Sequence, residues 1–406
     1  MTESYKNQLV ERVRQALSEE DMPFGGIVRA CRGAYPTLVL QLLKNMRPEI
    51  ATKTIEAFAL ESLSRRNSEI ASGLSELEGN PVLSSWYFTS DTCYRLERLQ
   101  DWSECAIAFM GTPRMYEWFA QKKIGKRRTL LDLDALVIDR LQTLAMARND
   151  EVALADIRDI VPDRLRGQFQ WAILDPPWYP EDYQVWISQA MALAPGGTLC
   201  ISLFPELTRP DASAERLRIL RDLKESAGRL TVVSEWLEYQ IPSFEECQLA
   251  ASGITSLGPW KLSDMVICEL KPGVRVNPGP RQFQRRDAWF EVDVGALRIF
   301  VTDPGDIRPG KELLKIVEGV SLTLPSPSRR LPGLENINVL TSRGDGLTCS
   351  YPPELIKILK DLRDVSLRNR SGLADRIDRL SIDHSSRNLL KKLLLTPVVR
   401  QKSGRP

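Results

Sequence analysis

Residues 171–178 read Trp-Ala-Ile-Leu-Asp-Pro-Pro-Trp, an apolar run that ends in an acid, two prolines and an aromatic residue. The first four residues have the length and apolarity of a buried strand. Pro176 and Pro177 end that strand, because proline lacks the N–H group that a strand interior must donate. Either the prolines only stop the strand and Trp178 covers the core, or the motif carries chemistry at the strand's end.

The sequence around this motif alternates between apolar runs and amphipathic segments. Strand-like runs occur at residues 105–110, 129–134, 152–157, 169–174, 198–204, 230–237 and 264–270. Helix-like segments lie between them at residues 114–122, 135–147, 182–193 and 211–225. This alternation predicts an α/β domain over residues 85–272, with a doubly wound parallel sheet and helices on both faces. Ligands of such sheets bind at the C-terminal ends of the strands.

Two regions of different character flank this domain. Residues 1–84 are predicted to be helical, and the pattern over 27–46 has the outline of a helix-turn-helix or winged-helix unit. A small helical cap explains that pattern equally well. Residues 273–406 begin with a Pro- and Gly-rich linker and predict an α+β domain with a helical tail. The tail is basic, with 13 Lys and Arg against 6 Asp and Glu from residue 351 onwards.

The composition excludes several classes of function. At about 150 residues per domain, the 406 residues predict two or three domains. The formal net charge is only +2, so no strong global field draws the chain to nucleic acid or to a membrane. The one histidine, His384, rules out zinc and iron sites that need several histidines from one chain. No metal site is predicted.

Cysteine usage and apolar run lengths indicate the compartment. The seven cysteines are scattered and form no Cys-x-x-Cys pair, which is typical of buried free thiols in a reducing environment. No apolar run reaches 18 residues, and the first residues lack the core of a signal peptide. We therefore expect a cytoplasmic protein that does not span a membrane.

The Asp-Pro-Pro-Trp motif suits alkyl transfer to a planar, weakly nucleophilic amine. The Asp175 carboxylate can accept one N–H of such an amine, and the Pro176 carbonyl can accept the other. The Pro176-Pro177 backbone is rigid, so it fixes that carbonyl. Both contacts strengthen as the nitrogen becomes pyramidal in the transition state. Trp178 offers a flat face on which a base can stack, and none of these steps needs a histidine.

Asp175–Trp178 resembles the Asp-Pro-Pro-Trp/Tyr motif of S-adenosylmethionine-dependent amino methyltransferases. With Trp, it resembles the adenine-N6 methyltransferases that act on messenger RNA. The resemblance implies a Rossmann-like, seven-stranded sheet, S-adenosylmethionine as methyl donor, and binding of the target amine by Asp175, Pro176, Pro177 and Trp178. In the messenger-RNA family the motif precedes the donor-binding loop, whereas the candidate donor loop here comes first, at Gly111.

That motif order, together with the helical N-terminus, is similar to the branched-chain polyamine synthases of thermophiles. Those enzymes join a winged-helix-like N-terminus to a Rossmann-like aminopropyl transferase that has an Asp-Pro-Pro motif. Their acceptor is a linear polyamine. The aromatic continuation Trp178-Tyr179 fits a planar acceptor better. The resemblance covers residues 85–270.

The donor pocket is expected at the ends of the first three strands. The first candidate loop contains Phe109, Gly111, Thr112 and Pro113, where a small residue lets the backbone approach the donor's methionine moiety. A plain strand-to-helix turn, with Pro113 at the first helical position, explains the same residues.

Acidic residues follow the next two strands. Asp132 lies 21 residues after Gly111, close to the expected spacing of about 20 for an acid that accepts the ribose hydroxyls. Asp134 is the alternative, or the N-cap of the following helix. The resemblance places Asp156 against the donor's adenine amine, and a surface ion pair with Arg158 is the competing interpretation.

Three further segments are candidates for binding. Residues 86–92 resemble the segment that closes over the donor in related methyltransferases, with core packing and helix capping by Ser90 or Asp91 as the alternative. Glu206 can orient an amine or be a solvated acid. Residues 238–262 are the candidate acceptor loop, and their aromatic residues are Tyr239, Phe244 and Trp260.

The sequence therefore predicts an S-adenosylmethionine-dependent N-methyltransferase that acts on a planar amine, foremost adenine N6 of a nucleic acid. Two alternatives stay open: a small-molecule, polyamine-like amine alkyl transferase, and an inactive methyltransferase-like scaffold in a larger assembly. Nucleic acid, DNA or RNA, and a protein are the candidate partners.

Overall fold

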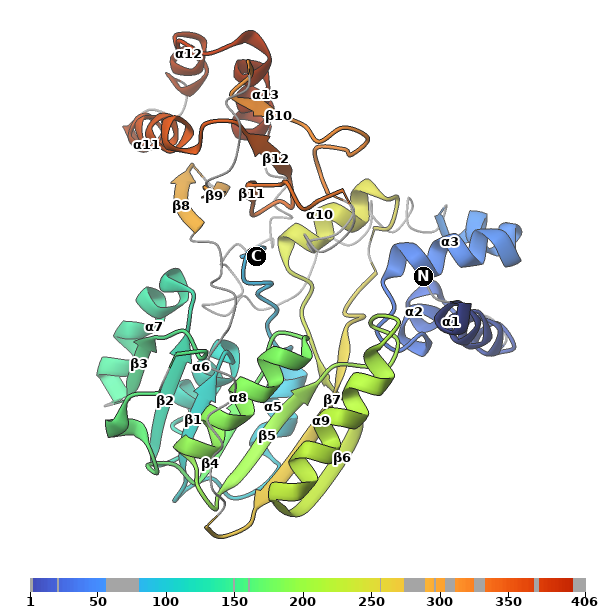
Figure 1. The fold of residues 1–406 in the computed structure, drawn as a ribbon, viewed down its shortest axis with the longest axis vertical. Helices are drawn as coiled ribbons and strands as arrows, with labels where there is room; N and C mark the ends of the chain where they lie inside the picture. The colour runs from blue at the N-terminus through green and yellow to red at the C-terminus, as the bar shows by residue number, and fades with distance from the viewer. Residues whose placement is uncertain are drawn as a thin grey trace, which may run out of the picture. The chain divides into compact units, whose positions relative to one another are not determined.

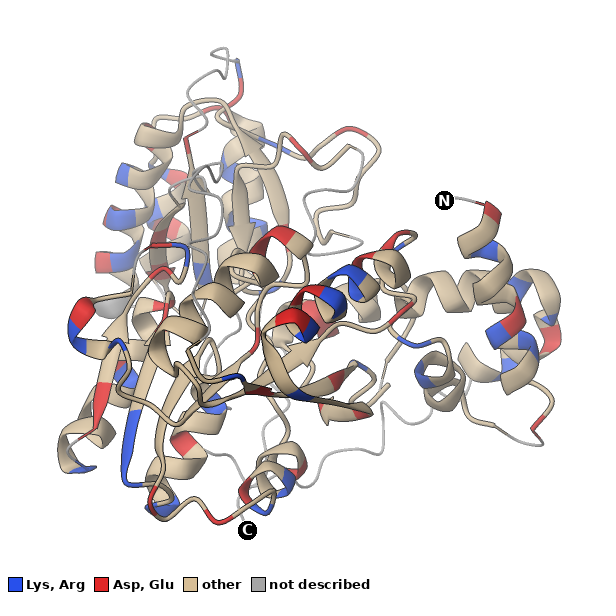
Figure 2. Ribbon diagram, turned by 60° about the horizontal axis from the view of Figure 1, so that its bottom comes forward, with Lys and Arg blue, Asp and Glu red and all other residues tan. Residues whose placement is uncertain are grey.

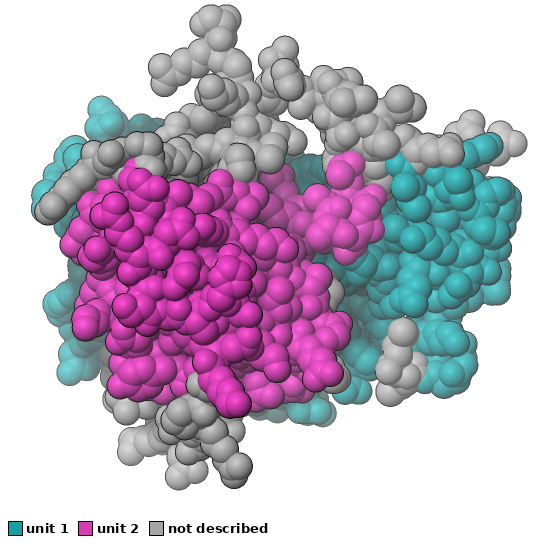
Figure 3. Space-filling view, turned by 90° about the horizontal axis from the view of Figure 1, so that it is seen from above, with its two compact units in different colours: residues 1–57, 86–241, 257–283 teal, residues 58–85, 242–256, 284–406 magenta. Residues whose placement is uncertain are grey.

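The structure is a computed structural model. It describes residues 3–19, 22–55, 80–148, 150–159, 161–255, 257–273, 289–295, 297–303, 311–324, 333–368 and 372–396. The chain forms two compact units (Figure 3). Unit 1 comprises Met1–Ala57, Trp86–Ile241 and Leu257–Phe283, and unit 2 comprises Phe58–Ser85, Pro242–Ser256 and Gln284–Pro406.

Unit 1 is built on a seven-stranded sheet in the order β3-β2-β1-β4-β5-β7-β6 (Figure 1). The strands are β1 Ala106–Met110, β2 Arg127–Asp132, β3 Glu151–Leu154, β4 Trp171–Leu174, β5 Thr198–Leu203, β6 Ala227–Glu238 and β7 Leu262–Leu270. Strands β1 to β5 pair in parallel, whereas β7 runs antiparallel to both β5 and β6. The predicted Rossmann-like, doubly wound α/β fold is confirmed.

Helices cover both faces of this sheet, as the alternation of side chains along its strands requires. They are α5 Ser90–Glu97, α6 Pro113–Lys122, α7 Ala135–Arg148, α8 Pro180–Leu193 and α9 Ala212–Ser226. Ala108 and Met110 of β1 share a core with the apolar side of α8 and α9. Phe109 points to the other face, where it packs against Tyr116 and Phe119 of α6.

The strand directions bring distant residues to one edge of the sheet. Asp175 follows the C-terminal end of β4. Because β7 is antiparallel to β5, its first residues lie beside the last residues of β5, and Asp264 pairs in register with Leu203. The C-terminal end of β6 reaches the same edge, where Glu238 pairs with Leu262. This edge is the place where ligands of parallel sheets bind.

The N-terminal helices belong to unit 1. They are α1 Glu3–Ala16, α2 Phe24–Ala30 and α3 Pro36–Met46. Tyr5 Oη donates a hydrogen bond to the Leu207 carbonyl over 2.8 Å, which ties α1 to the loop after β5. The expected helix, turn and helix are present. Nucleic-acid binding by this segment, and domain boundaries at 84/85 and 272/273, stay predictions.

Unit 2 contains the α+β region. Its five-stranded antiparallel sheet has the order β10-β12-β11-β9-β8. The strands are β8 Trp289–Val294, β9 Leu297–Thr302, β10 Leu314–Lys315, β11 Val339–Thr341 and β12 Gly346–Cys349. The helices are α10 Ser243–Ala251, α11 Pro352–Arg368, α12 Gly372–Asp378 and α13 His384–Leu395. The last three helices form the expected helical tail and pack on the sheet in one apolar core.

Candidate active site

Asp175 belongs to a largely buried hydrogen-bond cluster that centres on the hydroxyl of Tyr239. Tyr239, just after β6, donates its hydroxyl to Asp175 Oδ1 over 2.7 Å. The same hydroxyl lies 2.6 Å from Ser202 Oγ of β5 and 3.2 Å from Ser263 Oγ of β7. The two serine oxygens are 3.0 Å apart. We call Asp175, Tyr239, Ser202 and Ser263 the hydroxyl cluster. It fixes the orientation of the Asp175 carboxylate.

Burial tunes the acidity of this cluster. Loss of hydration raises the pKa of Asp175 to about 6, and hydrogen bonds from Tyr239 and Ser202 and the positive charge of Lys261 oppose that rise. Burial, and then the negative charge of Asp175, raise the pKa of Tyr239 well above its ordinary value. Tyr239 therefore remains a donor, whereas Asp175 can gain or lose a proton near neutral pH.

A small pocket opens beside Asp175 in unit 1. It contains about 150 Å³ of empty space, and its lining residues are Trp86, Tyr87, Phe88, Gly111, Thr112, Pro113, Arg114 and Asp175. The structure thus brings together the predicted donor loop, the predicted amine-binding aspartate and the predicted covering segment. The figure of about 150 Å³ includes space open to solvent, and no enclosed room for even a water molecule remains, so any ligand bound here requires the lining residues to move.

Gly111 is constrained by packing rather than by the pocket alone. Its backbone has a φ of +62°, a region that side chains other than glycine rarely adopt. A Cβ atom built on it would lie 2.6 Å from a ring carbon of Trp186 on α8. The space that glycine leaves is therefore filled by Trp186, which supplies a reason for this glycine that the sequence did not reveal.

We expect Gly111→Ala to lower the free energy of unfolding by about 2–5 kcal/mol, the sum of left-handed backbone strain and overpacking against Trp186. Urea unfolding of the whole chain measures this loss. Gly253→Ala is the matched control, because Gly253 has a φ of +81° and a Cβ atom added to it would meet nothing within 4 Å. Gly253→Ala should lower the free energy of unfolding only by the cost of the left-handed backbone, about 1–2 kcal/mol. Equal losses in the two variants would refute a role for Trp186.

The two acids after β2 have different environments. Asp132 is partly buried, and its Oδ1 accepts the backbone N–H of Asp134 over 2.9 Å. Burial, followed by the negative charge of Asp134, raises the pKa of Asp132 to about 7, against the effect of its backbone hydrogen bonds. Asp134 instead caps α7, since its Oδ1 accepts the N–H of Leu136 over 3.0 Å. Asp132 is thus the better placed of the two to accept a ligand's hydroxyls.

Three other predicted site residues point their side chains elsewhere. Asp156 forms an ion pair with Arg158, whose Nε lies 3.0 Å from Asp156 Oδ1, and the pair is partly buried rather than at the surface; donor binding by Asp156 stays a prediction. The Phe109 ring is fully buried in the core beneath α6. Thr112 Oγ1 donates to the Ile173 carbonyl of β4 over 3.4 Å. Phe109 and Thr112 can offer only their backbone groups to a ligand.

The segment at 86–92 is fastened to the end of β6. Phe88 forms a β-bridge with Tyr239, and Gln240 donates its N–H to the Tyr87 carbonyl over 2.8 Å. The cap of α5 is Thr89, whose side chain accepts the N–H of Thr92; Ser90 and Asp91 lie within the helix.

Three aromatic rings beside Asp175 surround the ammonium group of Lys261. Its Nζ lies 3.9 Å from the ring centroid of Trp86, 4.3 Å from that of Trp178 and 5.8 Å from that of Tyr239. Trp86 and Trp178 each meet Tyr239 edge to face, at interplanar angles of 90° and 75°. We call Trp86, Trp178 and Tyr239 the aromatic box. Sequence reasoning did not find Lys261, although it directly follows Trp260 in the candidate acceptor loop.

Arg114 is a second residue that sequence reasoning missed. It lines the pocket, is buried, and pairs with buried Glu117 over 2.6 Å. Its Nη2 lies 3.4 Å from Ser90 Oγ. Its buried Nε has no hydrogen-bond partner among the described residues. The signal in the sequence is an arginine directly after Pro113, at the start of the helix that follows the donor loop.

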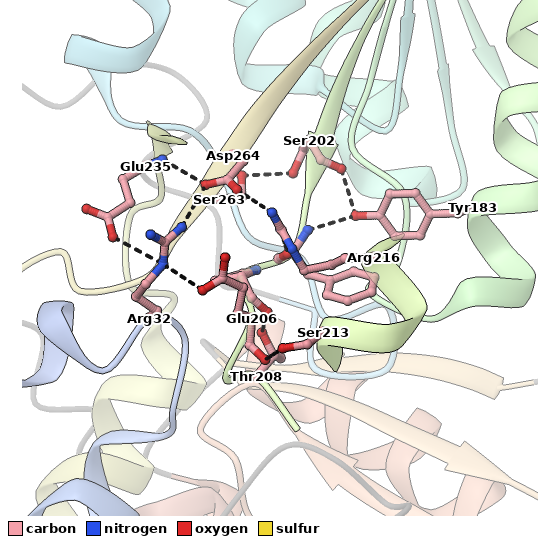
Figure 4. Close-up of polar contacts among 12 residues, drawn as sticks. Arg32, Tyr183, Ser202, Glu206, Thr208, Ser213, Arg216, Glu235, Ser263 and Asp264 are labelled. Atoms are coloured by element: carbon pink, nitrogen blue, oxygen red, sulfur yellow. Dashed lines mark hydrogen bonds and ion pairs between the residues drawn. The ribbon is translucent and has the colours of Figure 1, made fainter. Parts of the chain in front are cut away.

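Charged residues form a second network at the same end of the sheet, around Asp264 (Figure 4). Asp264, next to Ser263, accepts from Arg216 Nη2 over 2.5 Å and from the backbone N–H of Glu235 over 2.8 Å. Arg32, from the turn between α2 and α3, lies 3.6 Å from Asp264 Oδ1 and 3.5 Å from Glu206 Oε2. Glu206, a candidate for orienting an amine, thus faces arginine side chains.

The remaining candidates in the acceptor loop are divided between the units. Tyr239 and Trp260 belong to unit 1, where Trp260 meets Trp86 edge to face. Phe244, on α10, is buried in unit 2. In the part of the chain that the structure describes, no three His, Cys, Asp or Glu side chains gather as a metal site. Within those same residues, none of the helices combines the length and apolarity that crossing a bilayer demands.

No protein-family model matches the sequence, and no curated protein does. Among solved structures, the chain is similar to the branched-chain polyamine synthase from Thermus thermophilus in complex with N4-aminopropylspermidine and 5'-methylthioadenosine. The TM-score is 0.52 at 16% identity, over 69% of this chain and 92% of the synthase. A C9 mutein of that synthase, in complex with the same two molecules, is matched with a TM-score of 0.52 at 16% identity. The match covers 68% of this chain and 90% of the mutein.

An rRNA methylase from Streptococcus thermophilus is matched over 99% of its own chain and 48% of this one, at 14% identity and a TM-score of 0.29. At these identities the likeness to the synthase is a likeness of fold.

Proposed function

We propose that this chain transfers an alkyl group from an S-adenosyl sulfonium donor to the nitrogen of an amine bound at Asp175. One observation carries the proposal. The Asp-Pro-Pro-Trp motif follows β4 of a 3-2-1-4-5-7-6 sheet, and its carboxylate is fixed by Tyr239 at the rim of a pocket. The fold shared with an aminopropyl transferase supports the same class of reaction.

The residues of the motif act by orientation and electrostatics. Asp175 accepts an N–H of the acceptor, and its fixed position makes that contact strongest as the nitrogen becomes pyramidal. A pKa of about 6 leaves the carboxylate mostly ionised at neutral pH and able to take up a proton. Trp178 bounds the acceptor on one side, and the Pro176 carbonyl is the second acceptor for its N–H groups.

The residues at the pocket fit the chemistry of an S-adenosyl donor. Bound there, such a donor supplies an alkyl carbon attached to a positively charged sulfur. The Gly111–Pro113 turn in the pocket lining offers backbone groups. Asp132 lies outside that lining, at the end of the neighbouring strand β2, and is proposed to offer its carboxylate to the ribose hydroxyls. The synthase with a similar fold binds 5'-methylthioadenosine. The pocket of about 150 Å³ admits the whole donor only if Trp86–Phe88 moves aside.

The aromatic box favours an aliphatic amine as acceptor. It already surrounds an alkylammonium group, that of Lys261, next to Asp175. An ammonium over the face of a tryptophan is stabilised by the ring quadrupole. The exocyclic amine of a base, adenine N6 foremost, is the second candidate, because the Trp178 face also suits stacking. If the acceptor is a base, we expect Trp178→Ala to abolish transfer. If the acceptor is an aliphatic amine, we expect the same substitution only to weaken transfer.

The proposed partners depend on the acceptor, whereas the proposed compartment depends on the cysteines. A nucleic-acid acceptor requires backbone contacts, for which the N-terminal helices and the basic tail are the candidates. Figure 2 shows basic and acidic residues interspersed along the helices. We propose the reducing cytoplasm as the site of action, supported by seven free thiols.

We expect the whole chain to bind S-adenosylmethionine and S-adenosylhomocysteine, and Asp132→Ala to weaken both by about 10–150-fold, the range for losing hydrogen bonds to a charged group. Binding should also be about tenfold weaker at pH 6 than at pH 8. The ionised form of Asp132 accepts the ribose hydroxyls, and lowering the pH through its pKa of about 7 removes that form. Titration calorimetry at the two pH values measures both effects.

Asp139→Ala is the matched control, because Asp139 is exposed on α7, seven residues after Asp132. It should leave both the affinity and its pH dependence unchanged. Absence of donor binding by the folded wild-type chain would refute the proposed function and leave the scaffold hypothesis. Binding that Asp132→Ala does not weaken would refute the role of Asp132 alone.

A further inference from the structure

The aromatic box holds a side chain that has the chemistry of an acceptor. Lys261 ends in a primary alkylamine, and its Nζ lies 4.3 Å from the ring centroid of Trp178, inside the motif proposed to bind the acceptor. The positive charge of this lysine lowers the pKa of Asp175, and the two groups interact at a distance longer than that of an ion pair. The amine thus lies where the proposed function requires an amine to be.

The box is assembled from separate parts of unit 1. Trp86 precedes α5, Trp178 follows β4 and Tyr239 follows β6. Lys261 stands immediately before β7, and its carbonyl accepts the N–H of Tyr239 over 3.1 Å. Because β7 is antiparallel to β5, the residue before it lies at the same edge as Asp175. The topology of the sheet therefore places the backbone of Lys261 at the site, and the position of its amine does not depend only on the length of its side chain.

We propose that Lys261 is an acceptor of the chain's own alkyl transfer, so that the protein modifies itself at this position. The inference rests on the proposed function, because it needs the same donor and the same aspartate.

The proposed step balances in atoms and charge. The Lys261 ammonium gives a proton to the Asp175 carboxylate, which frees the lone pair on Nζ. A bond forms between Nζ and the donor's methyl carbon while the bond between that carbon and sulfur breaks, and its electron pair remains on sulfur. The products are a methylammonium side chain, neutral S-adenosylhomocysteine and a proton that Asp175 releases to solvent.

Lys122 supplies a matched comparison. Its Nζ lies 4.3 Å from the Trp118 ring centroid, the same separation that Lys261 has from Trp178. Lys122 is also paired with Glu97 over 2.6 Å. It ends α6, a helix that begins at Pro113 beside the pocket and runs about 15 Å away from it. Lys122 therefore has an aromatic neighbour but neither the pocket nor Asp175.

The test needs no external acceptor. The whole chain is incubated with S-adenosylmethionine, and peptide mass spectrometry locates any added methylene group. We expect the addition on Lys261 in the wild type and in Lys122→Arg, and its loss in Lys261→Arg and in Asp175→Asn. Decarboxylated S-adenosylmethionine, tried in parallel, should add an aminopropyl group at the same residue if that is the donor.

Calorimetry on the same samples separates the two possible failures. If the donor binds and the mass of the Lys261 peptide is unchanged, self-modification is refuted and the proposed function stands. Labelling that persists in Asp175→Asn, or that spreads equally over other lysines such as Lys122, also refutes it, because such labelling is uncatalysed chemistry. If the donor does not bind, the proposed function fails, and this inference with it. Lys261→Gln repeats the test if Lys261→Arg unfolds.

Discussion

Asp175→Asn will slow alkyl transfer by about 10²–10⁴-fold, the range measured for removing a general base or a charged group that stabilises a transition state. Asparagine has the same shape and can still accept the hydroxyl of Tyr239, but it carries no negative charge and takes up no proton. The expected loss lies in the rate of the reaction. Affinity for the donor should change little, because the proposed ribose contact is Asp132.

The free energy of unfolding should respond in the opposite direction. Burial raises the pKa of Asp175 to about 6, above its value near 4 in an unfolded chain. Ionisation therefore costs the folded state stability as the pH rises from 4 through 6. Removing the carboxylate should raise stability at pH 8 by up to about 3 kcal/mol, since each pKa unit is worth about 1.4 kcal/mol. A variant that is inactive because it is misfolded would instead be less stable.

The rate is followed as S-adenosylhomocysteine released with a panel of acceptors: single-stranded DNA, single-stranded RNA and spermidine. With any acceptor that reacts, the wild-type rate should rise with pH through about 6, because the ionised carboxylate is the form that accepts the proton. Asp222→Asn, an exposed acid on α9, is the control and should keep the wild-type rate. A wild-type rate in Asp175→Asn would remove the motif from the mechanism.

The second large effect concerns stability. Asp264→Asn will lower the free energy of unfolding by about 3–5 kcal/mol, the cost of leaving a buried charge without its partner. Asp264 is 1% exposed and Arg216 is 7% exposed, so water cannot solvate either charge if its partner is removed. Asparagine still accepts the N–H of Glu235, but it cannot neutralise Arg216 or attract Arg32. The loss follows from the unpaired guanidinium.

Chemical unfolding measures this loss, and two variants set its scale. Asp222→Asn breaks only the exposed contact between Arg221 and Asp222 and should cost less than about 1 kcal/mol. Replacing both buried partners, Asp264→Leu with Arg216→Met, should recover most of the loss, because no buried charge remains. If the double variant is as unstable as Asp264→Asn, the penalty comes from packing and not from the charge.

The sheet could be predicted from the sequence because its strands are continuous apolar runs. All seven predicted runs overlap the strands of unit 1, and the helices between them lie within a few residues of their predicted bounds. The start of helix α5 was an open alternative, as a cap at Ser90 or Asp91, but its eight mostly polar residues give too little periodicity to define the helix. Helix α10 lies in a stretch expected to be a loop. Its first residues, Ser243–Glu246, have the Ser-x-x-Glu spacing that is typical of a helix start, so the sequence did contain a signal for it.

The site could be predicted only in part. Asp175 and Gly111 each directly follow an apolar strand, and parallel strands bring such ends together. Tyr239 and Lys261 could not be assigned to Asp175, because their positions depend on the direction of β7 and on its pairing with β6. The pairing of Asp156 with Arg158 was an open alternative, and local spacing cannot show whether a neighbouring arginine turns toward a carboxylate or toward a ligand.

The hydroxyl cluster can reverse its polarity without moving a heavy atom. With Asp175 ionised, Tyr239 points its hydrogen at the carboxylate. Once Asp175 holds a proton, it can donate to the Tyr239 oxygen, and Tyr239 can turn its own hydrogen to Ser202 or Ser263. A proton that arrives at Asp175 thereby changes the direction of hydrogen bonds as far as Ser263. The three hydroxyls can therefore relay a change in the protonation of Asp175 across the ends of β5 and β7.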